Sequence, residues 1–266
     1  MRILNTHSFY KLIQPCRVMK SQKYKVFVIN LDRSSERLEQ ITMQLKNIGL
    51  GFERISAVDG NVQTDEFLNK YYSGKLNRKK YYIPLKKAEI GCYISHLKAC
   101  EKIVRDNLDY AIILEDDIIL EPYFEIIPDV LNSIDKKWNY IKLIFSGRKK
   151  KIIERTPVDV GIFYDSPYEF ELVKWKKPPF GTQAYAISRE GAVEFLKKRS
   201  VFYRPIDVDL QFTWETNLDV MGLIPQLCSH SNVESEIGER DLNKEYHHPL
   251  AKLVYKFKYL ILSIFK

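Results

Sequence analysis

The chain has 266 residues, 45% of them hydrophobic, which is enough for the core of one large α/β domain or two small ones. Lys and Arg outnumber Asp and Glu by 42 to 34, and this formal charge of +8 favours an anionic partner: nucleic acid, acidic lipid or a phosphorylated small molecule. No apolar run approaches the roughly 20 residues of a transmembrane helix. Four scattered cysteines and no signal-peptide pattern indicate a reducing, cytoplasmic compartment.

The first elements predict the opening of a parallel sheet. Residues 1–22 form an N-terminal extension in which Met19 is an alternative start, and the first strand begins at Tyr24. A helix follows within 32–49, because apolar residues recur there at helical spacing: Leu38, Ile41, Leu45 and Ile48. A short strand then ends at the turn pair Asp59-Gly60. The order strand, helix, strand is typical of α/β proteins.

The rest of the chain continues this alternation. Residues 61–86 are polar and predicted to be loop with one short helix, followed by a long helix near 86–107 and the strand "YAIILEDD". Further elements are a helix at 122–134, strands at 138–145, 151–156, 169–175 and 181–188, a helix at 189–199, a helix at 210–217 and a strand near 220–228. Without a repeat or a low-complexity linker, we expect one α/β domain over 23–245, a Rossmann-type, mostly parallel sheet flanked by helices, and a tail over 246–266.

Polar groups stand where the predicted strands end. These are Asn30 to Arg33, Asp59, and the triplet Glu115, Asp116 and Asp117. Ligands of open α/β sheets bind at the carboxyl ends of strands, so these groups are expected to share one crevice.

The acidic triplet favours a metal ion. Adjacent carboxylates repel one another at a partly buried strand end unless a cation neutralises them. Mg²⁺ or Mn²⁺ suits such oxygen ligands together with a substrate phosphate. A solvated turn is the alternative, and neither the Asp-any-Asp pattern of phosphohydrolases nor an EF-hand loop fits the spacing.

Four blocks together resemble glycosyltransferase family 25, which includes bacterial lipooligosaccharide galactosyltransferases and collagen galactosyltransferases. They are "VFVINLDRSSERLEQITMQLKNIGLGFERISAVDG", "AEIGCYISHLKACEKIV" with "YAIILEDDIIL", "GTQAYAISREGAVEFL" and "PIDVDL". The resemblance implies a GT-A-like fold and an inverting, metal-dependent transfer of a hexose, with galactose from UDP-galactose as first choice. A UDP-glucose- or UDP-N-acetylhexosamine-using enzyme is the alternative within this fold.

The resemblance also implies roles for individual residues. Glu115, Asp116 and Asp117 would hold Mn²⁺ or Mg²⁺ on the donor diphosphate, with Glu115 and Asp117 preferred. Donor contacts are expected from eight residues: Asn30, Asp32, Arg33, Arg37, Asp59, Glu89, Ser95 and His96. Asp207 and Asp209 are the candidates for the base that takes the acceptor proton. Three alternatives stay open: Arg37 as a solvated helix charge, His96 as a structural residue and Asp207 as a helix cap. His230 is a further candidate metal ligand.

The tail is predicted to be a basic amphipathic helix. At 100° per residue, one face collects Leu250, Leu253, Val254, Phe257, Ile261, Ile264 and Phe265, with Lys252, Lys256 and Ser263 opposite. Such a helix suits an anionic membrane interface, although a helix packed on the domain with its lysines outside is the alternative. We therefore expect a cytoplasmic enzyme at the inner face of the cytoplasmic membrane, acting on a lipid-linked glycan such as lipooligosaccharide outer core. Nucleic-acid binding is the rival reading of the charge, and no recognition motif supports it.

Overall fold

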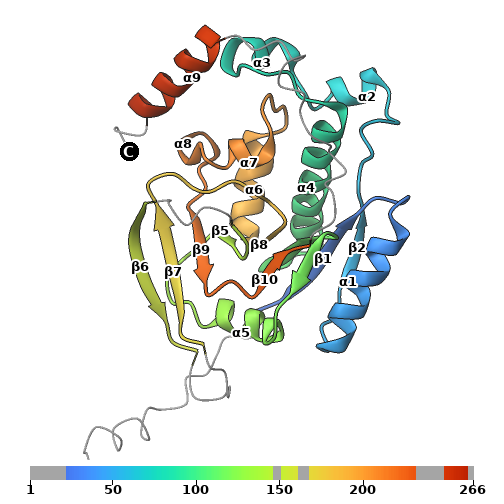
Figure 1. Ribbon diagram of the computed structural model, residues 1–266, viewed down its shortest axis with the longest axis vertical. Coiled ribbons are helices and arrows are strands. Elements are labelled where there is room, and N and C mark those ends of the chain that lie inside the picture. Colours follow the sequence, from blue (N-terminus) through green and yellow to red (C-terminus); the bar gives the residue numbers. More distant parts are fainter. Residues whose placement is uncertain (1–21, 146–150, 161–167, 232–248, 263–266) are drawn as a thin grey trace, which may run out of the picture.

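The computed structural model describes residues 22–145, 151–160, 168–231 and 249–262. Its centre is an eight-stranded sheet with the order β2-β1-β3-β8-β5-β9-β7-β6 (Figure 1). The strands are β1 (Tyr24–Asn30), β2 (Glu53–Ser56), β3 (Tyr110–Glu115), β5 (Tyr140–Lys142), β6 (Ile152–Val158), β7 (Phe170–Trp175), β8 (Ala184–Ser188) and β9 (Val220–Ile224).

The sheet is mixed and mostly parallel. Strands β2, β1 and β3 are mutually parallel, β8 runs against β3 and β5, and β9 is again parallel to β5. Strand β7 opposes both β9 and the edge strand β6. Only β8 and β7 therefore run against the others among the strands of this sheet, and the predicted α/β class is confirmed.

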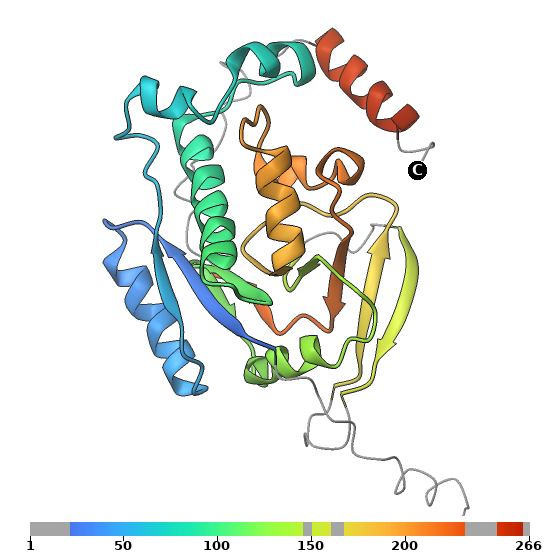
Figure 2. The same cartoon turned by 180° about the vertical axis from the view of Figure 1, so that it is seen from behind.

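Helices cover both faces of the sheet (Figures 1 and 2). Helices α4 (Lys87–Arg105) and α6 (Arg189–Lys198) pack on one face, and α1 (Ser35–Asn47) and α5 (Ile127–Asn132), preceded by the short helix η3 (Phe124–Ile126), pack on the other. The alternation of side chains along a strand produces both cores. In β1, Phe27 and Ile29 join the α4 side, whereas Val26 and Val28 join the α1 side.

Two glycines allow α4 to pack directly against the loop after β2. A Cβ atom on Gly91 of α4 would lie 2.3 Å from the carbonyl oxygen of Val58, and one on Gly60 would lie 1.7 Å from that of Lys87. No side chain fits at such distances. This backbone contact fixes the start of α4 beside the carboxyl ends of β1 and β2.

Three sequence predictions about elements were wrong. Residues 61–86 hold two short helices, α2 (Asp65–Asn69) and α3 (Gly74–Lys80), where one was expected. The expected helix at 210–217 is replaced by two single turns, α7 (Ile206–Asp209) and α8 (Thr213–Thr216), the second ended by Asn217 at φ 58°. The last strand stops at Ile224, because Pro225 has no N–H to donate to a ladder.

A small second sheet lies outside the main one. Strand β10 (Cys228–His230) pairs antiparallel with β4 (Ile118–Leu120), which directly follows the acidic triplet. The sequence did not indicate this pairing, because strands of three residues show no measurable periodicity.

The C-terminal helix α9 (Pro249–Leu262) lies beside α3 at one end of the molecule (Figures 1 and 2). Residues 1–21, 232–248 and 263–266 lie outside the described parts of the chain, so the alternative start at Met19 and the domain boundary at 245 stay predictions. Within the described parts, no helix combines the length and apolar character needed to cross a membrane.

Candidate active site

A pocket opens where β1, β2 and β3 end. Ile29 pairs with Glu115, and Asn30 pairs with Ser56, so the three carboxyl ends meet at one edge. Nine of the residues selected from the sequence line this pocket: Asn30, Arg33, Arg37, Asp59, Ser95, His96, Glu115, Asp116 and Asp117. The structure therefore brings together most of the proposed metal and donor ligands, from segments up to 87 residues apart in the chain (117 − 30).

The acidic triplet forms the link between two strands of different sheets. Glu115 is the last residue of β3, and Asp116 and Asp117 turn the chain into β4. Glu115 is held by the hydroxyl of Thr182, which donates to its Oε1 at 2.8 Å, and Nε2 of His96 lies 3.4 Å from the same oxygen. Burial alone would raise the pKa of Glu115, but the neighbouring His96 and Thr182 outweigh burial and lower it.

Asp116 is also engaged by neighbouring side chains. The Asn30 amide donates to its Oδ2 at 2.6 Å, and a guanidinium nitrogen of Arg37 lies 3.6 Å from its Oδ1. Asn30 is itself buried and donates to the carbonyl oxygen of Ser34 at the start of α1. Asn30 thus positions Asp116 relative to α1, and Arg37 faces the pocket rather than bulk solvent.

Asp117 differs from the other two acids. Its Oδ1 is buried and has no hydrogen-bond partner among the described residues. Burial, followed by the negative charges of Glu115 and Asp116, raises the pKa of Asp117 to about 7. A buried carboxylate oxygen without a partner costs free energy that a bound cation would recover.

The residues present fit a divalent cation that is shared with a substrate. In the described parts of the chain, no group of three or more His, Cys, Asp and Glu side chains is arranged to hold a metal ion by itself. Mg²⁺ and Mn²⁺ commonly take only one or two protein carboxylates and complete their shell with phosphate oxygens and water. The unsatisfied Asp117 oxygen suits that arrangement best, with Glu115 and Asp116 beside it.

Positive charge enters the same pocket from the start of α1. Arg33 forms an ion pair with Asp59, whose other oxygen accepts from the backbone N–H of Asn61 at 3.1 Å. Arg37 is one turn further along α1. Together with the N-terminal end of this helix, the two arginines give the pocket positive charge beside its acids, which favours the binding of an anion.

Two predicted donor ligands lie outside the pocket lining. Asp32 has 74% of its side chain exposed and accepts from Arg54 and Ser56. Glu89 accepts from the backbone N–H of Lys86 at 2.8 Å and so caps the start of α4. These contacts favour structural roles for Asp32 and Glu89, because each carboxylate accepts hydrogen bonds from neighbouring groups of the protein.

Ser95 and His96 are buried at the base of the pocket. The Ser95 hydroxyl donates to the carbonyl oxygen of Gly91 and accepts from the N–H of Val58, which ties α4 to the loop after β2. Nδ1 of His96 lies 2.9 Å from the hydroxyl of Tyr185 on β8. His96 of α4 therefore contacts both β8, through Tyr185, and Glu115 at the end of β3, and it can orient that carboxylate.

Asp207 remains the candidate base. It lies in α7 and accepts from the N–H of Val208 at 2.7 Å, and it caps neither α7 nor α8, whose N-caps are Pro205 and Phe212. Partial burial raises its pKa, while the charge of Lys142 acts in the opposite direction. Lys142 is buried at the end of β5, and burial lowers its pKa to about 8 against the charges of Asp207 and Glu115. A carboxylate with a raised pKa is suited to accept a proton.

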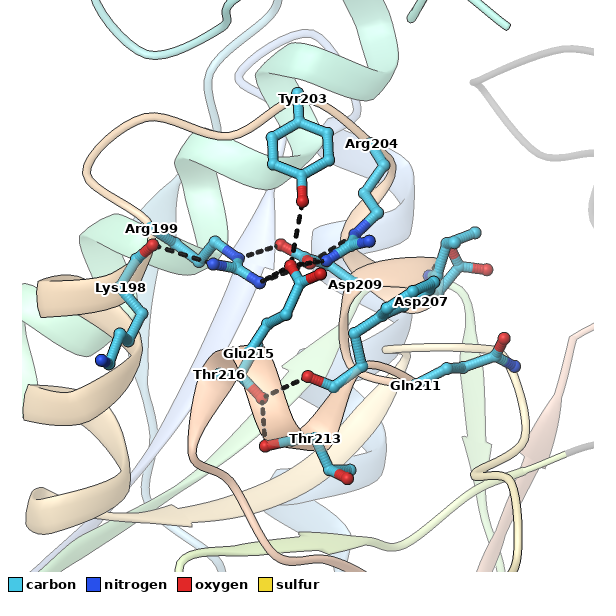
Figure 3. Close-up of polar contacts among 12 residues, drawn as sticks. Lys198, Arg199, Tyr203, Arg204, Asp207, Asp209, Gln211, Thr213, Glu215 and Thr216 are labelled. Carbon is cyan, nitrogen blue, oxygen red and sulfur yellow. Dashed lines mark hydrogen bonds and ion pairs between the residues drawn. The ribbon is translucent and has the colours of Figure 1, made fainter. Parts of the chain in front are cut away.

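Asp209 does not suit the role of base that the sequence suggested. It is 1% exposed and lies between two guanidinium groups, with Arg204 Nε at 2.6 Å and Arg199 Nη2 at 2.9 Å from Oδ1 (Figure 3). The Tyr93 hydroxyl donates to its Oδ2 at 2.6 Å. Burial would raise the pKa of Asp209, but Arg204 and Arg199 outweigh burial and lower it.

The same arginines also bind Glu215, which accepts from the Tyr203 hydroxyl at 2.9 Å (Figure 3). Figure 3 draws no contact between Asp207 and the arginines of this network. Asp209 and Glu215 thus hold the loop between α6 and α8, and the network fixes the position of α7, which carries Asp207.

Several residues of the site were not found from the sequence. Tyr185 and Lys142 come from strands β8 and β5, and Thr182 lies in the loop before β8. Nothing in their local sequence pattern marks them as neighbours of Glu115. His230 pairs with Ile118, immediately after the triplet, so its proposed role as a metal ligand stays a prediction. Gly60 and Gly91 stood in the quoted blocks, and only the packing shows why no side chain fits there.

A family model and individual relatives both show similarity of this chain to glycosyltransferases. The model of "Glycosyltransferase family 25 (LPS biosynthesis protein)" matches residues 23–210. A "Glycosyltransferase 25 family member" of Aedes aegypti is 30% identical over 209 residues, which cover 74% of this chain and 33% of that protein. "Procollagen galactosyltransferase 1" of Danio rerio is 29% identical over 194 residues, covering 71% of this chain and 31% of its own. The chain spans about a third of the length of these curated relatives.

Among solved structures, a Drosophila galactosyltransferase 7 in complex with manganese, UDP-Gal and xylobiose is 12% identical to this chain. The match has a TM-score of 0.38 and covers 84% of this chain and 74% of the other.

Proposed function

Because the chain belongs to glycosyltransferase family 25, we propose that it transfers a hexose from a UDP-sugar to a glycan acceptor, with a divalent metal bound and with inversion at the anomeric carbon. The relatives named as procollagen galactosyltransferases make galactose the first choice of hexose. UDP-glucose and UDP-N-acetylhexosamines are the alternatives.

The observation that carries this proposal is the environment of Asp117. Its buried oxygen has no partner among the described residues, and it lies in a pocket that Arg33 and Arg37 also line. A pocket lined by an unsatisfied carboxylate and by two guanidinium groups suits a diphosphate with its metal. When bound, Mn²⁺ or Mg²⁺ would be held by Asp117, with Glu115 and Asp116 beside it, and would neutralise charge on the diphosphate.

Side chains of the protein would stabilise the leaving group, position the acidic turn and contact the donor. Arg33, Arg37 and the N-terminus of α1 would stabilise the negative charge that grows on the departing UDP. Asn30, Thr182 and His96 hold the acidic turn in place through Asp116 and Glu115. Asp59, Ser95 and His96 also line the pocket, which supports the proposal that they contact the nucleoside or the sugar.

Asp207 would act as the base. The acceptor oxygen forms a bond to the anomeric carbon while the bond from that carbon to the phosphate oxygen of UDP breaks. The acceptor proton passes to the Asp207 carboxylate, whose raised pKa favours this transfer. A single displacement of this kind inverts the configuration without a covalent glycosyl-enzyme intermediate.

We further propose a lipid-linked glycan, such as lipooligosaccharide outer core, as the acceptor, and a cytoplasmic location at the inner face of the cytoplasmic membrane. The family description as an LPS biosynthesis protein supports this acceptor class. The basic helix α9 supports contact with an anionic membrane surface.

The proposal is tested by a donor screen. The purified chain is incubated with Mn²⁺ and a panel of UDP-sugars, and UDP release is measured with and without lipooligosaccharide. We expect acceptor-dependent release from UDP-galactose, loss of release in Asp117→Asn, and full release in the matched control Asp65→Asn, whose side chain is 78% exposed on α2. If no UDP-sugar is bound or turned over, the proposed function is wrong.

A further inference from the structure

Helix α9 binds the domain through its tyrosines. Tyr255 packs against Tyr81 and Tyr82 with ring centroids 5.3 Å apart in both pairs, and against Phe212 at 5.4 Å. Tyr259 contacts Phe212 and Trp214, and its hydroxyl donates to the carbonyl oxygen of Gln211. The side of α9 that carries these two tyrosines is therefore the side facing the protein.

The opposite side of α9 is apolar and exposed. Leu253 and Phe257 have 64% and 62% of their surface exposed, and Val254 and Ile261 have 48% and 38%. A helix that served only to cover the domain would turn these residues inward. Helix α9 therefore packs on the domain with its lysines exposed, as in the sequence-based alternative, but it packs through its tyrosines and leaves its apolar side exposed.

Basic residues accompany this apolar side on α9 and on the neighbouring helix α3. Lys252, Lys256 and Lys258 of α9 are exposed, and the adjacent α3 adds four exposed basic residues: Lys75, Arg78, Lys79 and Lys80. Neither helix contains an acidic residue. The two helices are neighbours at one end of the molecule (Figures 1 and 2), and Tyr81 and Tyr82, which directly follow α3, contact Tyr255 of α9.

We propose that the exposed apolar side of α9 and the basic residues of α3 and α9 form one docking surface for an anionic lipid bilayer. Aliphatic and aromatic side chains surrounded by lysines are the chemistry that enters the boundary between headgroups and acyl chains. The charge without acidic residues is complementary to anionic lipid headgroups. A segment of six residues, 81–86, connects α3 to α4, whose Ala88 and Cys92 line the pocket, so a bilayer bound here would lie on the side of the domain where α4 begins.

The surface is tested by binding of the full chain to vesicles, a readout that is independent of the proposed transferase activity. Cosedimentation is measured with vesicles of phosphatidylcholine alone and of phosphatidylcholine mixed with phosphatidylglycerol. We expect binding to the mixed vesicles that weakens with salt. Lys79→Glu should weaken it by more than the roughly fivefold expected for loss of one positive charge, and Leu253→Asp with Phe257→Asp should abolish it.

Matched controls lie on α1, a helix on the other side of the molecule from α9 (Figure 1). Met43 is 57% exposed and Lys46 is also exposed, so Met43→Asp and Lys46→Glu introduce the same chemical changes elsewhere. Both variants should bind like the unchanged protein. Equal binding to neutral and anionic vesicles, or binding unaffected by the α9 double variant, would overturn the proposal. So would a concentration-dependent dimer that the double variant dissociates, because the occupant would then be a second copy of the chain.

Discussion

Asp117 predicts a specific pH dependence for metal binding. Its pKa in the metal-free protein is about 7, because it is buried beside Glu115 and Asp116. A metal ligand must be deprotonated, so protons compete with the metal below this pH. With a pKa of about 7, roughly nine-tenths of the Asp117 side chains are ionised at pH 8 and roughly one-tenth at pH 6. The apparent affinity for Mn²⁺ should therefore fall about tenfold from pH 8 to pH 6, which corresponds to about 1.4 kcal/mol.

The assay is titration of the protein with Mn²⁺ alone, followed by the electron paramagnetic resonance signal of the free ion at several pH values. Leaving out UDP removes the titration of its own phosphate. Asp117→Asn should bind Mn²⁺ more weakly and without the change centred near pH 7, whereas Asp65→Asn should behave like the unchanged protein. An affinity that is constant between pH 6 and pH 8, or an unchanged pH profile in Asp117→Asn, would refute the assignment of Asp117.

Three further predictions concern the surroundings of the pocket. Asp209→Asn leaves Glu215 as the one carboxylate shared by Arg199 and Arg204 among the described residues and should lower the free energy of unfolding by ~3–5 kcal/mol in urea at pH 7. Because folding lowers the pKa of Asp209, its contribution is complete above its unfolded pKa of about 3.9 and is lost as the pH falls below it, so the difference between the two proteins should shrink in acid. A loss under ~1 kcal/mol at pH 7 would show that the network is not a major anchor. Asp207→Asn should lower kcat by roughly 10²–10⁴-fold with the affinity for UDP unchanged, and an unaltered kcat would exclude Asp207 as the base. Gly91→Ala places a Cβ 2.3 Å from the Val58 carbonyl and should destabilise the fold by ~1–3 kcal/mol, measured by thermal unfolding; a variant as stable as the original would contradict the close packing.

The part of the site at the carboxyl ends of β1, β2 and β3 could be predicted from the sequence, because it depends on local sequence patterns. The helical spacing of Ile41 and Leu45 and the alternation in β1 define a strand–helix–strand unit, and parallel strands place their carboxyl ends together. Asn30, Asp59 and the acidic triplet follow those ends directly. Their meeting in one pocket therefore follows from topology alone.

The roles of the other residues depend on long-range contacts that the local sequence pattern does not indicate. Asp207 and Asp209 are two residues apart and look alike in the sequence, yet Asp209 is paired with Arg199 and Arg204 because single-turn helices fold the chain back on itself. Glu115, Asp116 and Asp117 are also distinguished only by their partners. The orientation of α9 was likewise decided by where Tyr255 and Tyr259 find aromatic neighbours, rather than by its hydrophobic face.

We propose above all that the pocket at the ends of β1, β2 and β3 binds a metal-bound nucleoside diphosphate through Asp117. The most direct test is a crystal structure of the protein with Mn²⁺ and UDP, in which anomalous scattering locates the manganese. We expect an anomalous peak within bonding distance of the Asp117 carboxylate, with the UDP diphosphate between the manganese and the side chains of Arg33 and Arg37. Manganese bound away from Asp117, or UDP bound outside this pocket, would contradict it.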